Sequence, residues 1–423
     1  MRLAIDGGKP ARNAPLPPNY PGAVMMGQEE AAGATEVILS KSPFRYYGPD
    51  VQNAVHRFED TMSAGLGVPY ALGVSSCTSA LIVALKALGI GYGDKVIVPA
   101  NTFLATAGAV VCSHAVPVFV DVDDSLNMNP LDLERVWDED VKAIIAVPIL
   151  GNPCDMDAIM AFARARGVPV IEDVAQSCGS SYKGRYAGTI GDIGVFSFQM
   201  NKIITSGEGG AVVTRDALLF ERAVRYHDQG LFRDKERYGL ESDEEANGFI
   251  GQNYRMSELA GSVLIEQWNK LEGINASTRR NHAAILSVLK ASLPGFRSRK
   301  VVDEEGYLGS NLGMILPSAE TAAAFIRALD AENIGTHLLY GGKPVYRQPQ
   351  LYEQRTADKN NFPFDYRFRK PVSYKKQPCQ AAEDLMARTV YLPVSPLLTS
   401  EDIEQITEGI VKVHRALVSE ARQ

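Results

Sequence analysis

The chain has 423 residues, 45% of them hydrophobic and 22% charged, which is the composition of a globular protein rather than a disordered, collagenous or coiled-coil one. Lys and Arg number 43 against 50 Asp and Glu, and the resulting formal net charge of −7 argues against a nucleic-acid-binding protein. At about 100–200 residues per domain, the length predicts two or three domains, or one large and one small domain.

Hydropathy and cysteine usage argue against a membrane protein, a secreted protein and a metal-binding protein. The longest apolar stretches, such as residues 143–150, have the length of a strand and fall short of the roughly 20 residues that span a bilayer, so we expect no membrane partner. Residues 1–12 lack the pattern of a secretory signal. The odd number of cysteines without CxxC spacing predicts reduced thiols in a cytoplasmic protein, and the scattered histidines predict no metal site. The cysteines are Cys77, Cys112, Cys154, Cys178 and Cys379.

Between residues 70 and 215, short β-rich runs alternate with patterns of helical period. The expected strands are 70–75, 95–99, 116–122, 143–148, 168–172, 195–198 and 211–214. The expected helices are 79–88, 102–112 and 155–166. This alternation predicts an α/β fold with a mainly parallel sheet flanked by helices on both faces. Such sheets bind ligands in the crevice beyond the carboxyl ends of their strands.

After residue 215 the pattern changes. We expect helices at 217–227, at 256–271, from there to about 289, at 321–333 and at 400–417, a strand at 313–317, a charged loop at 232–247 and a long polar segment at 346–380. We therefore predict a large N-terminal domain with its arm over residues 1–275 and a small C-terminal α+β domain over residues 276–423.

The most informative stretch runs from residue 170 to residue 213. A strand ends in Glu172-Asp173, and Lys202 follows a second strand that carries the apolar triplet FSF. An acid and a lysine that converge on one crevice suit pyridoxal 5′-phosphate: the lysine forms a Schiff base with the aldehyde, and the carboxylate pairs with the protonated ring nitrogen. Taken singly, each has a plainer explanation, because a lone lysine is usually solvated and an Asp after a strand often caps a helix.

A cofactor phosphate needs backbone N–H groups at the start of a helix, together with hydroxyl groups. The sequence SSCTSAL at residues 75–81 provides a small-residue turn between a strand and a helix, with Thr78 as the main candidate. Ser197 is a second hydroxyl and Asn253 a further polar group, while Phe103 opens another helix where it can cover one face of the ring. The alternatives are a simple capping segment for residues 75–81 and ordinary core packing for Phe103.

From about Gly48 to about Ile406, the sequence resembles the sugar aminotransferases of the DegT type, within the fold-type I pyridoxal-phosphate enzymes. The motifs that carry this resemblance are SSCTSAL (75–81), VIVPANTFLAT (96–106), GNPCDMDAI (151–159), IEDVAQS (171–177), FSFQMNKIITSGEGGAV (196–212), GQNYRMSELA (251–260) and YLPVSPLLTSEDI (391–403). Together they are highly specific, whereas no single one would be.

The resemblance implies roles for individual residues. Lys202 would carry the cofactor and then act as the proton-transfer base, Asp173 would pair with the pyridine nitrogen, Gln176 would lie near the ring hydroxyl, and Phe103 would stack on the ring. The phosphate ligands implied are Thr78 with the amide of Cys77, Ser197, and Asn253 reaching into the neighbouring subunit, which makes the expected active unit a homodimer with shared active sites.

Two departures from the family pattern concern the site. Cys77 stands where the phosphate turn usually has a glycine, and a side chain is tolerated there only if the backbone needs no positive φ. The segment 148–151 also lacks a histidine that many relatives carry, which points to a different substrate subgroup.

The substrate side of the site is less clearly marked. Residues 3–12 and the loop with Tyr47 resemble relatives that act on free cyclitol ketones, although they could equally be an ordinary N-terminal arm. His227, His337 and Tyr340 are candidates for the substrate pocket, with a buried, satisfied histidine as the plainer alternative. The basic, tyrosine-containing segment 346–380 is either a lid over an anionic substrate or a solvated loop or dimer contact.

These observations predict an aminotransferase with two half-reactions. The amino donor would be L-glutamate or L-glutamine, and the acceptor a nucleotide-linked keto sugar or a ketocyclitol, in antibiotic or polysaccharide biosynthesis. The alternatives are another pyridoxal-phosphate reaction such as dehydration or elimination, which Lys202 disfavours, and a non-catalytic cofactor-binding regulator.

Overall fold

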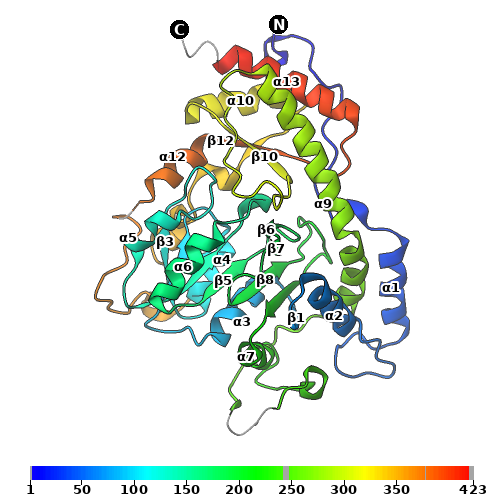
Figure 1. The fold of residues 1–423 in the computed structure, drawn as a ribbon, viewed down its shortest axis with the longest axis vertical. Helices are drawn as coiled ribbons and strands as arrows, with labels where there is room; N and C mark the ends of the chain where they lie inside the picture. The colour runs from blue at the N-terminus through cyan, green and yellow to red at the C-terminus, as the bar shows by residue number, and fades with distance from the viewer. Residues whose placement is uncertain (1, 242–246, 377, 419–423) are drawn as a thin grey trace.

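A computed structural model of the protein describes residues 2–241, 247–376 and 378–418, and it is built around one seven-stranded sheet (Figure 1). In spatial order the strands are β1 (Tyr70–Val74), β9 (Gly210–Thr214), β8 (Ile193–Ser197), β5 (Val170–Asp173), β4 (Val141–Ala146), β2 (Lys95–Pro99) and β3 (Val116–Val120). Only β9 among them runs antiparallel to its neighbours, which confirms the expected α/β fold with a mainly parallel sheet.

Helices cover both faces of this sheet, and the strands are apolar because they are buried on both sides. The flanking helices include α3 (Cys77–Ala87), α4 (Leu104–Cys112), α5 (Leu133–Val136), α6 (Met156–Arg166) and α7 (Ala217–His227). Polar side chains cap several of them: Ser76 accepts a hydrogen bond from the amide of Ser79 at the start of α3, and Asp155 does the same for Ala158 in α6. The expected elements of this region are thus present, with ends shifted by a few residues.

The C-terminal residues form a smaller layer above the large sheet in Figure 1. Its sheet has the antiparallel order β10 (Asn311–Ile315), β12 (Thr389–Pro393) and β11 (His337–Leu338), and its helices are α10 (Ala319–Ala331), α11 (Pro349–Tyr352), α12 (Gln380–Arg388) and α13 (Ser400–Val418). The sequence analysis predicted β10, α10 and α13 but not α12, β11 or β12. A short hairpin, β6 (Ser181–Tyr182) with β7 (Arg185–Tyr186), lies beside the large sheet.

One helix, α9 (Glu258–Ser292), joins the two layers as a single element of 35 residues. It runs past α1 (Gln28–Leu39) and α2 (Ala54–Leu66), neither of which was predicted, and then packs against α13 (Figure 1). The prediction of two helices here was wrong, because Gly273 interrupts the apolar pattern without interrupting the helix. The predicted domain boundary at residue 275 lies inside this helix, and the division into domains stays a prediction.

The first residues of the chain form an arm that spans both layers. The amides of Ala4 and Ala11 donate to the buried carboxylate of Glu332 at 2.9 and 2.7 Å, and Arg12 pairs with Asp402 at 2.8 Å. Farther along, the amide of Gly22 donates to the backbone carbonyl of Lys202 at 3.3 Å. The arm therefore ties the C-terminal layer to the loop that carries the predicted cofactor lysine.

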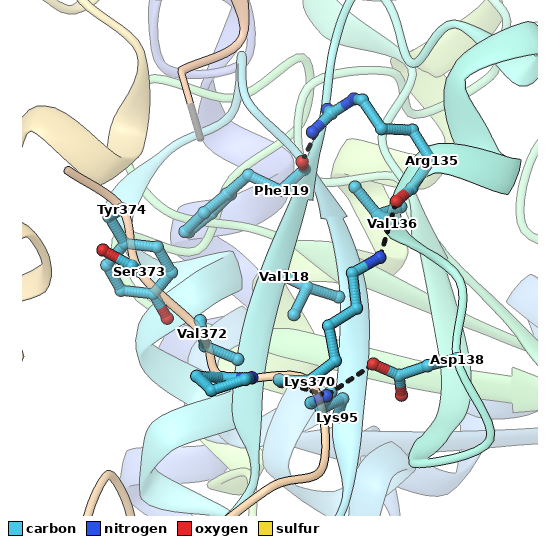
Figure 2. A pocket seen from close by; sticks show the side chains of 11 residues that line it. Lys95, Val118, Phe119, Arg135, Val136, Asp138, Lys370, Val372, Ser373 and Tyr374 are labelled. Atoms are coloured by element: carbon cyan, nitrogen blue, oxygen red, sulfur yellow. Dashed lines mark hydrogen bonds and ion pairs between the residues drawn. The ribbon is translucent and has the colours of Figure 1, made fainter. Parts of the chain in front are cut away.

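The polar segment 346–380, apart from residue 377, is a strap along the edge strand β3. The hydroxyl of Tyr374 donates to the carbonyl of Pro117 at 2.7 Å, and Lys95, only 1% exposed, donates to the carbonyl of Lys370 at 2.9 Å and pairs with Asp138 (Figure 2). The cavity between strap and sheet measures about 30 Å³, which is space for one or two water molecules and not for a sugar. The strap thus protects a sheet edge.

Residues 235–238 form a 3₁₀ turn within the predicted charged loop 232–247, while residues 242–246 of that loop lie outside the described residues. None of the helices in the described ranges combines the length and the apolar character that crossing a bilayer requires.

The contact of the arm with the lysine loop gives a first prediction. A Cβ at Gly22 would lie 2.7 Å from Oε1 of Gln267 and 2.8 Å from Cα of Ile204, so Gly22→Ala must push the arm away. We expect it to lower the free energy of unfolding by about 1–3 kcal/mol in denaturant titrations. Gly273→Ala is the matched control, because a Cβ there meets nothing within 4 Å and should add about 1 kcal/mol of helix stability. Equal effects of the two substitutions would contradict the tight docking of the arm.

Candidate active site

The carboxylate of Asp173 lies at the carboxyl end of β5 and is only 3% exposed. Its Oδ2 accepts a hydrogen bond from the hydroxyl of Thr106 at 2.8 Å. Its Oδ1 accepts from the amide of Ala175 at 3.2 Å and from the thiol of Cys77 at 3.8 Å. A second threonine, Thr102, lies 2.7 Å from the Thr106 hydroxyl and continues the chain of hydrogen bonds. The carboxylate is therefore held in one orientation by groups from three different segments.

Burial and these donors act on the charge of Asp173 in opposite directions. Desolvation raises the pKa of the Asp173 carboxyl, while the hydrogen bonds from Thr106 and Ala175 and the nearby Lys202 ammonium lower it, with burial as the larger effect. A cation placed against this carboxylate would keep it ionised. The protonated nitrogen of a pyridine ring is such a cation, so the site suits the partner that the sequence predicts.

Lys202 lies in the loop between β8 and β9, and its side chain is half-buried near Asp173 and Cys77. The loop is fastened to the rest of the molecule, because Oε1 of Gln267 in α9 accepts from the amide of Thr205 at 3.2 Å. Burial lowers the pKa of the Lys202 ammonium, against the opposing charge of Asp173. A lysine with a lowered pKa supplies more neutral amine at neutral pH, which is the form that attacks a carbonyl or takes up a proton.

The turn before α3 has the features of an anion site. Cys77 and Thr78 are the first two residues of α3, where the helix itself offers no acceptor for their amides. Strand β9 passes very close, since a Cβ at Gly210 would lie 2.5 Å from the carbonyl oxygen of Ser76. Because Cys77 is the first residue of α3 and Ser76 before it is extended, with φ of −165°, the turn needs no glycine at position 77, which accounts for the departure noted in the sequence.

A third group of side chains comes from farther along the chain. The amide nitrogen Nε2 of Gln176 donates to the hydroxyl of Tyr340 at 2.7 Å, and Oε1 of Gln176 accepts from the amide of Leu150 at 3.3 Å. The ring of Tyr340 lies 6.0 Å from the ring of Phe103, which is 58% exposed. The structure thus brings Phe103, Gln176 and Tyr340 together.

Of four other predicted site residues, one is buried and three are exposed. Ser197 is buried at the end of β8, where its hydroxyl accepts from the amide of Gln199 at 3.5 Å. Asn253 is exposed, and its Oδ1 accepts from the amide of Arg255 at 3.4 Å. Tyr47 and His337 are exposed as well. Among the described residues, neither Asn253 nor Tyr47 makes a hydrogen bond, ion pair or ring contact with Asp173 or Lys202, so their roles stay predictions.

His227 is fully buried, and both of its ring nitrogens have partners. Nδ1 lies within hydrogen-bond distance of the carbonyl of Val224, and Nε2 lies 3.4 Å from the hydroxyl of Tyr46. Burial, with the nearby Arg45 guanidinium, lowers the pKa of His227 to about 4. The ring is therefore neutral, with its proton on Nδ1, and is held as a satisfied core histidine.

Sequence reasoning missed Thr106, Leu150 and Arg299 as neighbours of the site. Thr106 could have been found, because it follows Thr102 by four residues at the start of a helix and shares its face. Leu150 and Arg299 could not be recognised from the sequence, since the role of Leu150 depends on a backbone turn and that of Arg299 on a segment that pairs with β10.

Comparisons with known proteins show what the whole chain is similar to. A model of the DegT/DnrJ/EryC1/StrS aminotransferase family matches residues 26–411. The L-glutamine:2-deoxy-scyllo-inosose aminotransferase of Streptomyces paromomycinus is 33% identical, over 99% of this chain and 99% of its own. The GDP-perosamine synthase of Escherichia coli O157:H7 is 33% identical, over 85% of this chain and 89% of its own. The X-ray structure of an aminotransferase from Psychrobacter cryohalolentis has a TM-score of 0.81 and 29% identity, over 96% of this chain and 100% of its own.

The chain belongs to the DegT/DnrJ/EryC1/StrS aminotransferase family, whose members are pyridoxal 5′-phosphate enzymes. The expected fold and the expected aminotransferase activity are confirmed, and the findings favour that activity over dehydration, elimination or a purely regulatory role. An aminotransferase takes an amino donor and a keto acceptor as its substrates.

The neutral state of His227 gives a second prediction. An unfolded chain binds a proton at this histidine near pH 6.5, whereas the folded chain binds it only near pH 4, so stability falls as the pH drops below 6.5. We expect His227 to account for about 2 kcal/mol of the stability lost between pH 7 and pH 5. In urea titrations, His227→Gln should lower the stability at pH 7 and flatten its decline toward pH 5. The same decline in both proteins would show that folding does not lower the pKa of His227.

Proposed function

We propose that this chain binds pyridoxal 5′-phosphate between Asp173, Lys202 and the start of α3 and transfers an amino group to a keto sugar or a ketocyclitol. The observation that carries the proposal is the meeting of a buried carboxylate, a half-buried lysine of lowered pKa and a helix start with free amides at the carboxyl ends of the parallel strands. Each matches one part of the cofactor: its ring nitrogen, its aldehyde and its phosphate.

The residues around this site have distinct tasks in the proposed reaction. When bound, the cofactor supplies an electron-accepting ring that stabilises the charge left on a carbon that loses its proton. Asp173 holds the proton on the ring nitrogen, and Thr106 and Ala175 keep the carboxylate facing it. Lys202 takes the proton from Cα of the amino donor in the first half-reaction and gives one to the acceptor carbon in the second. General acid–base transfer of this kind contributes about 10²–10⁴-fold to a rate.

The substrates are proposed from the relatives and from the residues. The donor is L-glutamate or L-glutamine, the latter supported by the name of the Streptomyces paromomycinus enzyme, which aminates the ketocyclitol 2-deoxy-scyllo-inosose. The perosamine synthase supports a nucleotide-linked keto sugar as the alternative acceptor. Amino sugar or aminocyclitol biosynthesis, for an antibiotic or a polysaccharide, is the proposed setting.

The active unit is proposed to be a homodimer with shared active sites. Asn253 lies in the exposed segment beside β1, where the carbonyl of Tyr254 accepts from the amide of Ser75 in the turn before α3. The side-chain amide of Asn253 is exposed and can donate to a phosphate held by a second subunit. Substitution of Asn253 would then weaken cofactor binding only in the assembled dimer, which mixed-dimer titrations can measure.

The cofactor and the donor are tested together by absorption spectroscopy. The purified protein should show the visible band of a lysine-bound pyridoxal cofactor, and addition of L-glutamate or L-glutamine should convert it to the shorter-wavelength band of the amine form. Keto sugars and ketocyclitols, offered one by one, should restore the first band when the right acceptor is present. Lys202→Ala should lack the lysine-bound band. A protein without this band, even with added cofactor, would overturn the proposal.

Removal of the Thr106 hydroxyl tests whether the Asp173 carboxylate binds the cofactor. Thr106→Val removes one donor to Asp173 and raises the pKa of that carboxyl further, so the cofactor should bind about tenfold more weakly or worse. Thr278→Val is the matched control, because Thr278 is equally buried and its hydroxyl donates to backbone carbonyls in α9 and near β10. It should cost stability while leaving the dissociation constant of the cofactor unchanged. An equal loss of affinity in both variants would count against the role of Thr106.

A further inference from the structure

The side-chain amide of Gln176 is held at both of its ends. The Leu150 backbone amide can only donate, so the group that faces it at 3.3 Å is Oε1, and Nε2 faces the hydroxyl of Tyr340 at 2.7 Å. This leaves one of the two Nε2 hydrogens without a partner among the described residues. The orientation of the amide is therefore fixed, and one N–H donor remains for a ligand.

Both groups that hold Gln176 belong to left-handed turns. Leu150 has φ 50° and ψ 46°, and Tyr340 has φ 53° and ψ 31°. For residues other than glycine this conformation costs on the order of 1–3 kcal/mol and persists only where the surroundings enforce it. Two such residues hydrogen-bond to the same side chain, that of Gln176, which indicates that the position of its amide group is important.

The turn at Leu150 is enforced from the C-terminal layer. Arg299, only 3% exposed, donates from Nη1 to the carbonyl of Ile149 and from Nη2 to the carbonyl of Leu150, each at 2.9 Å. Its side chain passes over Gly313 of β10, where a Cβ would lie 3.2 Å from Cδ of Arg299. Arg299 thus presents the Leu150 amide to Gln176.

The turn at Tyr340 brings its phenol into the same site. The ring lies 6.0 Å from that of Phe103, and burial, reinforced by the charge of Asp173, raises the pKa of Tyr340, so the phenol keeps its proton. As the acceptor for Gln176, the hydroxyl still has its own proton to donate. Tyr340 therefore lies beside the groups assigned to the cofactor ring and shares a hydrogen bond with only one of them.

We propose that Tyr340 is a positioning residue that fixes the Gln176 amide, so that its remaining N–H donates to the ring oxygen of the cofactor. This inference rests on the proposed function, because it requires the cofactor ring to lie against Gln176. It also assigns Tyr340 a task other than contact with the sugar or cyclitol. The C-terminal layer would in this way adjust the cofactor through one side chain.

A double-mutant cycle tests the coupling of the two residues. Tyr340→Phe removes only the hydroxyl and keeps the ring and the turn. It should weaken cofactor binding about twofold to tenfold, the range for one neutral hydrogen bond. The pH midpoint of the visible band should rise, because a ring oxygen with a weaker donor binds more tightly the proton it shares with the Lys202 nitrogen. In a Gln176→Leu background, Tyr340→Phe should change neither quantity.

Two further measurements separate the possible failures. Tyr346→Phe is the control for loss of a buried tyrosine hydroxyl, since Tyr346 donates to Glu383 at 2.6 Å away from this site, and it should lower the melting temperature without moving the pH midpoint. Equal effects of Tyr340→Phe with and without Gln176, or no effect at all, would overturn this inference and leave the proposed function standing. An unsubstituted protein that binds no cofactor would overturn both.

Discussion

The rest of the site depends on the free-energy cost of removing the Asp173 carboxylate from water at the end of the buried strand β5. A charge removed from water needs partners, and here they are a hydroxyl, a backbone amide, a thiol and a lysine that come from four separate segments. Their convergence explains why the loops after β1, β2, β5 and β8 all bend toward one edge of the sheet. The same burial lowers the pKa of Lys202, so one physical cause prepares both the acid and the amine.

Segments that are distant in sequence also contribute to the site at the carboxyl ends of the parallel strands. Arg299 and Tyr340 come from the C-terminal layer, and Gly22 comes from the N-terminal arm, yet each makes a hydrogen bond to a loop of the large sheet. The large sheet therefore supplies the reactive groups, while the rest of the chain determines how tightly their loops are held. The uninterrupted helix α9 holds the two layers in a fixed relative position, because it packs against both.

The sequence was most informative where periodicity and motif coincide. Alternating apolar runs that end in small or charged residues predicted strands β1 to β5, helices α3, α4 and α6, and the positions of Asp173, Lys202 and Thr78, whereas the short helix α5 was not predicted. Helices α1 and α2 escaped notice, and α9 was divided at Gly273, because a helical glycine in a polar stretch resembles a break. The two hydrogen bonds that hold Gln176 could not be predicted from the sequence. Leu150 and Tyr340 adopt left-handed conformations that their residue types do not favour, and Arg299 reaches the Leu150 turn from the C-terminal layer.

The N-terminal arm has a consequence for the order in which the molecule assembles. Residues 4, 11 and 12 bind Glu332 and Asp402, and residue 22 binds the carbonyl of Lys202. A ribosome makes residues 4, 11 and 12 first, but their partners, Glu332 directly after α10 and Asp402 in α13, emerge only after most of the chain has been translated. The first part of the arm must therefore stay unattached through most of synthesis, whereas residue 22 can meet Lys202 once that part of the chain has been made. The contact between residue 22 and the lysine loop lacks this anchor until the end of the polypeptide is in place, so an incomplete chain holds its reactive amine less firmly than the finished one.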